Sequence, residues 1–337
     1  MSDPAKHAAN KRAVVDNLRA LFTSDDLEAA AAKAYMEEAE LHAFHPVNDQ
    51  LGASAIASEL WGPIRESFPD AERRDQILLA NEFEGRDYVA AVSVIQGTFA
   101  KDWLGIPATH GVATLRCCEI NRVVDGRIKR AYVLIDVLDL MFQAGCWPLS
   151  PSLGEEGRWR APATVDSVKP DIVDPENGTK ALEIVRAMHE GLLAFDGKSL
   201  SSMHHAQYWA PDFLWYGPAG IGTTRGLAGF EAHHQIPFLR AFPDRTVGKH
   251  IAHVSDGNYV FTGGWPSVIA THTGPDWLNV GPTGRRIEMR VMDFYRVENG
   301  LLAENWVPID IVNILLQMGV DVFARLKHLR GEPRRDL

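Results

Sequence analysis

Apolar residues recur at helical spacing near the start of each half of the chain. Residues 11–37 and 54–67 show this pattern in the first half, and residues 176–195 and 227–242 show it in the second. These stretches therefore predict amphipathic helices. Segments rich in β-branched and aromatic residues follow the helices in both halves and predict strands. Because helices come first and an antiparallel meander follows, each half is predicted to be an α+β domain.

The clearest strand pair is a hairpin at residues 293–310, where Asn299-Gly300 favours a type I′ turn. Side chains alternate between the two faces of a strand, so one face of this hairpin is expected to collect an unusual set. Its members are Asp293, Tyr295, Glu304, Trp306, Pro308 and Asp310. A purely structural sheet rarely carries this mixture of carboxylates and large aromatics, so the hairpin is the first candidate for function.

The same hairpin occurs earlier in the chain. Residues 119–136 surround the turn Asp125-Gly126, and Asp310 follows Asp136 by 174 residues. The same interval separates Gly300 from Gly126. A repeat of this length indicates two copies of one domain.

We place the first domain at residues 10–145, a linker at residues 146–175 and the second domain at residues 176–330. The linker is rich in proline, which sustains neither helix nor central strand, so it is predicted to be extended. Trp147 and Trp159 are expected to attach it to a domain surface. We expect the domains to pack through their sheets as an intramolecular pseudo-dimer, and a homo-oligomer of the whole chain is compatible with this arrangement.

Composition narrows the function classes. The chain has 337 residues and a formal net charge of −10, without a long cluster of Lys and Arg, which argues against nucleic-acid binding. Three cysteines without a pairing pattern and a polar N-terminus without an apolar segment predict a cytoplasmic protein. No run of about 18 apolar residues exists, so no membrane partner is expected.

Asp310 is the first candidate for catalysis. A carboxylate at the end of a strand, next to Trp306, is expected to be partly desolvated, which raises its pKa and suits a general acid or base. The competing interpretation is an N-cap for the helix predicted to follow, because Asp is a preferred cap. Asp136 in the first copy has the same ambiguity. Asp293 either lines the same cavity or faces solvent.

Histidines offer further candidates. His272 shares a strand face with Val268 and Ala270, so it is either a hydrogen-bonded core residue or a proton shuttle. His233 and His234 are adjacent on a helix, where neighbouring side chains point about 100° apart, so they are poor joint metal ligands. One of them is expected to line a pocket. We therefore expect no metal and no cofactor.

Several aromatic residues offer surface for an apolar ligand, although each also fits an ordinary core. They include Tyr216, Trp265 and Trp306. The sequences typical of serine hydrolases, zinc proteases and nucleotide hydrolases do not occur. The loop Gly217–Gly222 lacks the glycine spacing of a dinucleotide site and is predicted to be a tight turn.

The second half carries several short sequences that together resemble one known family. They are Gly281-Pro-Thr-Gly284, Asp293-Phe-Tyr-Arg296, Asn299-Gly300, Trp306-x-x-x-Asp310 and Leu315-x-Gln317-Met-Gly319. The chain resembles the SnoaL-like polyketide cyclases of the nuclear-transport-factor-2-like superfamily. Residues 176–325 resemble the family well, and residues 11–145 more weakly. The resemblance implies two cone-shaped α+β domains, each with a curved antiparallel sheet wrapped on its N-terminal helices.

The resemblance also implies a chemistry. In these cyclases an Asp at the position of Asp310 acts as the general acid and base of an intramolecular aldol closure, and Asp136 would be its counterpart. We therefore expect a cofactor-independent cyclase, isomerase or lyase acting on a small, partly apolar carbonyl compound. His272 would assist the proton transfer, and the substrate would contact Tyr216, His233, His234, Trp265, Asp293 and Trp306. The alternative is a module of the same fold that binds a ligand or a protein without catalysis.

Overall fold

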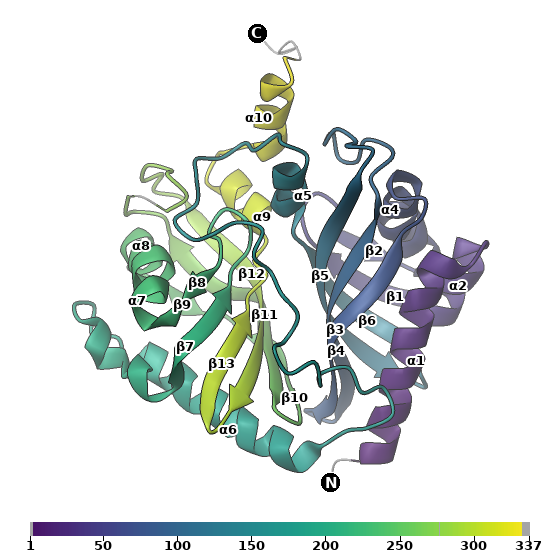
Figure 1. Ribbon diagram of the computed structural model, residues 1–337, viewed down its shortest axis with the longest axis horizontal. Helices are drawn as coiled ribbons and strands as arrows, with labels where there is room; N and C mark the ends of the chain where they lie inside the picture. Colours follow the sequence, from purple (N-terminus) through teal and green to yellow (C-terminus); the bar gives the residue numbers. More distant parts are fainter. Residues whose placement is uncertain (1–2, 276, 332–337) are drawn as a thin grey trace.

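The computed structural model describes residues 3–275 and 277–331 and contains two α+β domains side by side (Figure 1). Each domain has one sheet, and the helices that precede its antiparallel meander cover the face directed away from the other domain. This arrangement leaves the two uncovered faces turned toward each other, with the linker running between them. The α+β class predicted from the order of helices and strands is confirmed.

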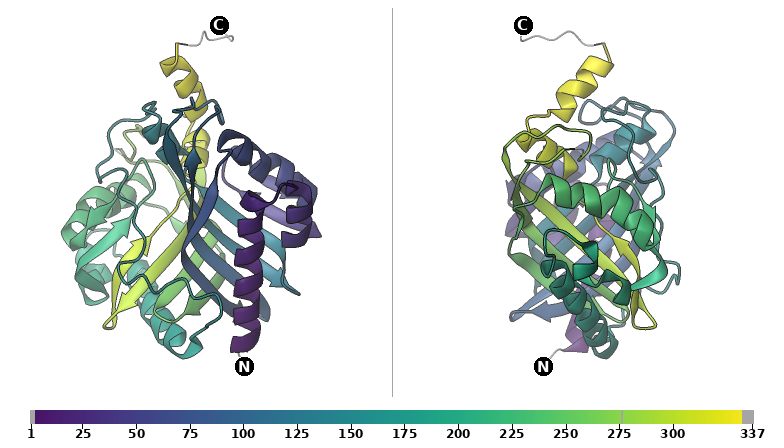
Figure 2. Two further views of the ribbon diagram at one scale, coloured as in Figure 1. Left: turned by 45° about the vertical axis from the view of Figure 1, so that its right-hand side comes forward. Right: turned by 90° about the vertical axis from the view of Figure 1, so that its left-hand side faces the viewer.

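The first domain begins with two helices, α1 (Pro4–Thr23) and α2 (Leu27–Ala34), and α1 runs along the outside of the sheet (Figure 2). A second helical segment contains α3 (Ala53–Ile56), a π-helical turn (Ala57–Trp61) and α4 (Gly62–Ser67). The six strands are β1 (Tyr35–Ala43), β2 (Asp49–Leu51), β3 (Glu72–Phe83), β4 (Arg86–Thr98), β5 (Val112–Val124) and β6 (Arg127–Ile135), in the spatial order β2-β1-β6-β5-β4-β3. Helix α5 (Val137–Gln143) closes the domain.

The second domain repeats this plan from α6 (Pro175–Leu193), through two short 3-10 turns (Leu200–Met203 and His205–Gln207), to α7 (Gly226–Phe230), a π-helical turn (Glu231–Gln235) and α8 (Ile236–Ala241). Its strands are β7 (Trp209–Tyr216), β8 (Thr224–Arg225), β9 (Thr246–Val247), β10 (His250–Asp256), β11 (Tyr259–Thr271), β12 (Arg286–Glu298) and β13 (Leu301–Trp306). Their order is β10-β11-β12-β13-β7-β8, with β9 paired to β11. Helices α9 (Ile311–Gln317) and α10 (Val322–Leu329) end the described chain.

Neither sheet is wholly antiparallel, which corrects the prediction in one respect. The meander strands pair antiparallel, but the first strand of each domain pairs in parallel with the last, β1 with β6 and β7 with β13. The helical segment between the first strand and the meander carries the chain across, so the first strand can return to the sheet beside the last. Local sequence signals do not specify this long-range pairing.

Several helices begin at an aspartate whose side chain caps them. Asp3 accepts hydrogen bonds from the amides of Ala5 and Lys6, and Asp174 accepts one from Asn177. The second helix is capped by Asp26, whose carboxylate accepts from the amide of Ala29. Such caps satisfy amides that have no partner within the helix.

The C-terminal hairpin contains a β-bulge that the regular alternation did not anticipate. Val297 pairs with Leu302, but the register then shifts, so Arg296 pairs with Glu304 and Phe294 with Trp306. A shift of one residue moves every later side chain to the other face. The predicted common face was therefore wrong: Asp293 and Tyr295 lie on the helix-covered face, whereas Glu304 and Trp306 lie on the interdomain face.

A pseudo-twofold pair of contacts holds the domains together. Oδ2 of Asp310 accepts hydrogen bonds from Nη1 of Arg290 (3.1 Å) and from the amide of His45 in the first domain (2.9 Å). Oδ2 of Asp136 accepts from Nη1 of Arg116 (3.2 Å) and from the amide of Ala219 in the second domain (2.8 Å). Each partner in the second set lies 174 residues from its counterpart. This symmetry agrees with an intramolecular pseudo-dimer of two related domains.

The segment that follows each domain in the sequence packs against the other domain. In the linker, the amide of Gly154 bonds the carbonyl of Ile221, and Glu156 accepts from the amide of Gly220, so this segment lies on the second domain. In the other direction, Nη1 of Arg330, which follows α10, donates to the carbonyl of Gly105 in the first domain (2.6 Å). None of the helices in the described residues is long and apolar enough to cross a membrane.

Candidate active site on the helix-covered face of the second domain

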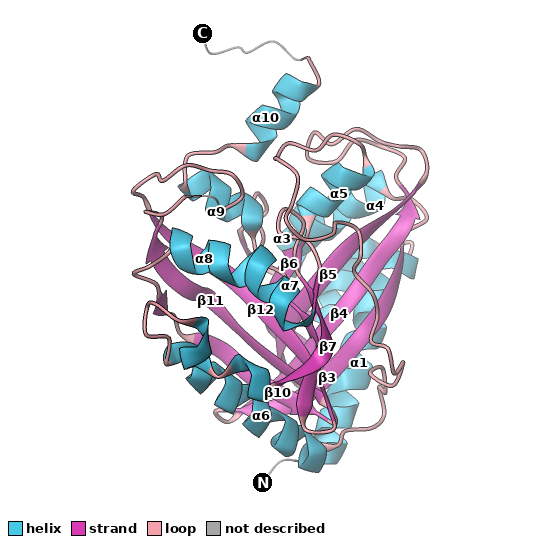
Figure 3. Ribbon diagram, turned by 60° about the vertical axis from the view of Figure 1, so that its left-hand side comes forward, coloured by secondary structure: helices cyan, strands magenta, loops and turns pink. Residues whose placement is uncertain are grey.

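The helix-covered face of the second sheet carries a row of polar side chains. Asp293 on β12 lies beside Thr262 on β11, and Thr262 lies beside His253 on β10. On the other side, Tyr295 pairs with Asn305 on β13. Helices α6, α7 and α8 cover this face (Figure 3). A row of this kind between a sheet and its helices is unusual for a core, where polar groups are costly to bury.

Helix α6 contributes His189 to the row. Its Nε2 lies 3.1 Å from the hydroxyl oxygen of Tyr295, and the two rings meet edge to face with centroids 5.9 Å apart. Burial, together with the neighbouring His250 and His253, lowers the pKa of His189 to about 4. Burial also raises the pKa of Tyr295 well above its ordinary value. At neutral pH this pair therefore consists of a neutral imidazole and a protonated hydroxyl.

Asp293 has a pKa suited to proton transfer. Desolvation raises the pKa of its carboxyl to about 7, although hydrogen bonds with Tyr295 and Asn305 oppose the shift. Among the ion pairs of the described residues none joins Asp293 to a Lys or Arg. The residue nevertheless keeps partial solvent exposure. A carboxyl that changes charge near neutral pH can both accept and donate a proton during turnover.

Aromatic side chains border this polar row. The ring of Trp209 lies 6.4 Å from that of Tyr295, and Trp215, which pairs with Asn305 through β7, stacks on His234 at 4.1 Å. Burial lowers the pKa of His234 to about 3, so it is neutral at physiological pH. His234 therefore lies on the helix-covered face, where its ring stacks with those of Trp215 and Phe238. A partly apolar ligand can pack against such aromatic side chains.

The structure places His272 far from Asp293. Although both lie on the helix-covered face, His272 follows Thr262, the partner of Asp293, by ten residues, which corresponds to roughly 30 Å of strand. Its Nδ1 lies 3.2 Å from Oγ1 of Thr283, and its ring packs 5.4 Å from that of Phe242. The side chain is fully buried. These contacts fit the core interpretation and keep His272 apart from Asp293. Its expected role as a proton partner of Asp310 stays a prediction.

Asp310 and Asp136 lie at the interdomain contact rather than beside Asp293. Asp310 caps α9 by accepting from the amide of Asn313 (3.1 Å), and Asp136 caps α5 by accepting from the amide of Asp139 (3.2 Å). Desolvation raises the pKa of Asp310 to about 6. The cap interpretation therefore has direct geometric support. The catalytic role expected for these two residues stays a prediction.

The three aromatic residues expected in the pocket belong to the interdomain face. Tyr216 stacks on Trp306 at 5.2 Å and donates its hydroxyl to Glu304 (3.3 Å), beneath the linker. Nε1 of Trp306 donates to the carbonyl of Arg160 in the linker (2.7 Å). Trp265 packs 5.5 Å from Tyr132 of the first domain. The structure does not bring these residues to Asp293.

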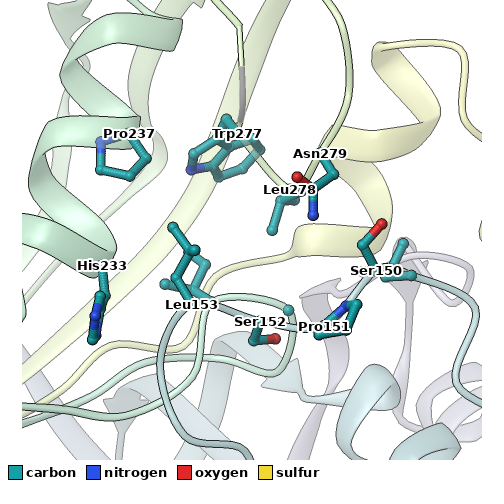
Figure 4. Close-up of a pocket in the computed structure, with 12 residues that line it drawn as sticks. Ser150, Pro151, Ser152, Leu153, His233, Pro237, Trp277, Leu278 and Asn279 are labelled. Atoms are coloured by element: carbon teal, nitrogen blue, oxygen red, sulfur yellow. The ribbon is translucent and has the colours of Figure 1, made fainter.

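His233 lines a different pocket, which lies between the linker and the helices of the second domain (Figure 4). The imidazole is exposed and faces this pocket together with Leu153 from the linker and Pro237 from α8. Trp277 forms the far wall. His233 therefore lines a pocket that is separate from the polar row, and its expected contact with substrate stays a prediction.

Sequence reasoning missed His189, His250 and His253. Histidines three residues apart on a regular strand point to opposite faces, so His250 and His253 did not suggest a cluster. The register shifts between His250 and Ala252, which turns both imidazoles to the helix-covered face. No set of three or more His, Cys, Asp or Glu side chains in the described part of the chain is arranged to hold a metal ion.

The sequence of the chain matches one known protein family. The model described as SnoaL-like polyketide cyclase matches the chain twice, at residues 12–144 and 185–318, and so covers more than half of it. The protein belongs to the SnoaL-like polyketide cyclase family. No curated protein matches the chain.

Solved structures of SnoaL-like and related proteins resemble parts of this chain. AclR from Streptomyces galilaeus, named as a candidate hydroxylase, is 21% identical over 43% of this chain and 86% of its own length, with a TM-score of 0.36. IdmH from Streptomyces antibioticus, named as a candidate polyketide cyclase, is 22% identical over 40% and 98%, with a TM-score of 0.34. An NTF2-like protein from Burkholderia xenovorans LB400 is 17% identical over 42% and 97%, with a TM-score of 0.33.

The first SnoaL-like copy has a different set of residues at the corresponding place. Glu119 stands 174 residues before Asp293, and it is fully buried in an ion pair with Nη2 of Arg73. Nε of Arg73 also donates to Asp75 (2.8 Å), which accepts from Nε of Arg19 (3.0 Å). The carboxylates of this copy are thus paired with guanidinium groups. Among the described residues, Asp293 of the second copy has no such cationic partner, unlike Glu119 at the corresponding position of the first copy.

Proposed function

We propose that the protein is a cyclase-type enzyme whose second SnoaL-like domain moves a proton at a carbon next to a carbonyl group. Asp293 is the general acid and base, and Tyr295 with His189 supplies hydrogen bonds to the carbonyl oxygen. The observation that carries the proposal is the desolvated carboxyl of Asp293, which has no Lys or Arg ion-pair partner among the described residues and lies beside the hydroxyl of Tyr295 on a face bordered by aromatic rings.

The reaction would proceed in two proton transfers. The carboxylate of Asp293 removes a proton from the carbon, and the electron pair of the broken C–H bond moves to the carbonyl oxygen as an enolate. Hydrogen bonds from the Tyr295–His189 pair stabilise that charge, because a hydrogen-bond donor stabilises an anion more strongly in a site shielded from water than in bulk water. In an aldol closure the enolate carbon then attacks a second carbonyl of the same molecule, and Asp293 returns the proton to the new alkoxide.

The substrate class follows from the surroundings. A small, partly apolar carbonyl compound would place its ring against Trp209 and Trp215 and its carbonyl oxygen near Tyr295. Isomerisation or elimination in such a compound needs the same proton transfer, so the proposal covers cyclisation, isomerisation and lyase chemistry.

Exchange of deuterium into a bicyclic ketone tests the proposal without knowledge of the natural substrate. The protein is incubated with 1-tetralone, and with a set of β-keto esters, in deuterated buffer, and loss of the α-proton signal is followed by NMR. We expect exchange above the buffer rate, and a loss of about 100-fold or more in Asp293→Asn.

Asp310→Asn is the matched control, because Asp310 is the other carboxyl of raised pKa on this hairpin. It should retain exchange within a few-fold of the unchanged protein. Equal rates in Asp293→Asn and the unchanged protein would remove Asp293 from the mechanism, and a selective loss in Asp310→Asn would transfer the role to that residue. Binding of these ketones with no exchange at all would favour a non-catalytic ligand-binding module.

A further inference from the structure

Three imidazoles gather at the β10 side of the candidate site. The rings of His189 and His250 are nearly parallel with centroids 6.0 Å apart, and those of His250 and His253 meet edge to face at 4.6 Å. They come from two elements, α6 and β10, and His189 also contacts the hydroxyl of Tyr295. We call these three residues the histidine cluster. Its nearest link to the proposed proton-transfer group is Tyr295, because Thr262 on β11 lies between His253 and Asp293.

The histidine cluster has unused hydrogen-bonding atoms. Nδ1 of His250 and both ring nitrogens of His253 are buried atoms without a hydrogen-bond partner among the described residues. Nε1 of Trp209, whose ring lies 6.4 Å from that of Tyr295, is also buried without a hydrogen-bond partner among the described residues. Buried polar atoms in folded proteins nearly always have a partner, so a group of unpaired ones at one place indicates where a ligand's polar atoms would fit.

The charges around the histidine cluster favour an anion. His250 and Arg186 are the charged or titratable groups that shift the pKa of His253, and His250 and His253 are those that shift the pKa of His189. The acid that faces the cluster across Tyr295 is Asp293, itself neutral over much of the acidic range.

A second cation lies on the chain just before β9 and β10. Arg245 is half-buried against the ring of Phe195, 5.2 Å from its centroid, and makes no ion pair among the described residues. Phe195 closely follows the end of α6, the helix that carries His189.

We propose that the histidine cluster binds an acidic group of the substrate, so that the natural substrate is an oxo or hydroxy carboxylic acid rather than a neutral ester. The carboxylate accepts hydrogen bonds from His250 and His253, and one imidazole takes up a proton as the ligand binds, since an adjacent anion favours the charged ring. The substrate carbonyl then lies over Tyr295 and Asp293. This inference rests on the proposed function for the position of the reacting carbon.

Titration calorimetry with 3-hydroxy-2-naphthoate and its methyl ester tests the inference. Measuring each at pH 7 in buffers of different ionisation enthalpy gives the number of protons taken up. We expect the acid to bind at least tenfold more tightly than the ester, with uptake of up to one proton. Its affinity should weaken as the pH rises above neutrality. Equal affinity of acid and ester, or binding without proton uptake, would overturn the inference.

Three variants assign the effect to the cluster. His250→Gln and His253→Gln should each weaken binding of the acid about tenfold or more and leave the ester unaffected, whereas His233→Gln, at an exposed imidazole of another pocket, should change neither. Unchanged binding of the acid in both cluster variants would refute the inference.

Asp293→Asn separates the two proposals, because its carboxyl also titrates near neutrality. It should lose deuterium exchange and still take up a proton with the acid. Proton uptake that disappears in Asp293→Asn would assign the proton to Asp293 and remove the cluster from the explanation. Proton-linked binding without exchange in the unchanged protein would leave the cluster intact and refute the proposed catalysis.

Discussion

The hydroxyl oxygen of Tyr295 lies 3.1 Å from Nε2 of His189, so one hydrogen bond joins the middle of β12 to the helix that covers it. The contact fixes the hydroxyl beside Asp293, two residues away on the same strand face. A donor held by the fold stabilises a developing charge without reorganisation during the reaction.

Tyr295→Phe removes this donor and little else. We expect kcat for deuterium exchange to fall by about 10- to 100-fold with a small change in KM, because the lost interaction is strongest in the transition state. Rates measured over a range of ketone concentrations check the prediction. A rise in KM at unchanged kcat would instead make Tyr295 a binding residue.

The raised pKa of Asp293 sets the pH dependence of exchange. The carboxyl removes a proton only when ionised, so the rate should rise with pH and level off above about pH 7. His189, with a pKa of about 4, stays neutral throughout this range. A pH profile of kcat/KM between pH 4.5 and 9 checks this. A midpoint near pH 4 would contradict the assignment.

The same pKa predicts how stability depends on pH. Because the pKa of Asp293 is raised in the folded protein, its stabilising contribution is fully present below the ordinary carboxyl pKa and is lost as the pH rises to about 7. The Asp293→Asn variant has no carboxyl to titrate, so its free energy of unfolding does not show this loss. The difference in free energy of unfolding, variant minus unchanged protein, should therefore be about 1 to 3 kcal/mol more favourable to the variant at pH 7.5 than at pH 4. Urea denaturation at the two pH values measures this. A difference that is independent of pH would show that the carboxyl is solvated.

Asp310 is expected to matter for stability more than for chemistry. Asp310→Ala removes the cap of α9 and leaves the amide of His45 and the guanidinium of Arg290 without their acceptor, which should cost about 2 to 4 kcal/mol. Urea denaturation gives the value, and the deuterium exchange rate should stay within a few-fold. Asp136→Ala is the pseudo-symmetric control and should cost a similar amount. Full stability in both variants would show that these contacts are not maintained in solution.

The ion pair between Arg73 and Glu119 allows a test of whether the first copy takes part in catalysis. Arg73→Met leaves Glu119 charged and buried without its partner, so it should destabilise the protein by about 3 to 5 kcal/mol. Adding Glu119→Gln should recover most of that loss, because the buried charge is gone. The double variant should exchange deuterium at the unchanged rate. Loss of exchange in a stable double variant would give the first copy a share in catalysis.

Much of the fold follows from the sequence because its signals are local. Helical periodicity, acidic caps and the turn Asn299-Gly300 act over a few residues, and the 174-residue interval between Asp136 and Asp310 made the duplication visible. The parallel pairing of the first and last strands of each domain was missed, because it joins residues far apart in the chain.

The candidate site was only partly predictable. Asp293 was recognised as a carboxylate on a strand beside Tyr295, but regular alternation grouped it with Trp306 and Asp310 on one face. A bulge between Arg296 and Val297 reverses that grouping. A second irregularity between His250 and Ala252 brings His253 to the site. Insertions of a single residue carry no reliable sequence signal, yet each changes the face of every residue beyond it.

The sequence by itself determined that the chain is a duplicated α+β protein of the SnoaL-like family, because repeats, periodicity and short family sequences are properties of the chain alone. The tertiary structure decided that Asp293 has no Lys or Arg ion-pair partner among the described residues, whereas Asp310 is bonded into the interdomain contact. Burial and charge pairing depend on side chains from distant elements, such as His189 beside Tyr295 and His45 beside Asp310. The pKa of a carboxyl is set by those neighbours, so only the folded chain distinguishes Asp293 from Asp310.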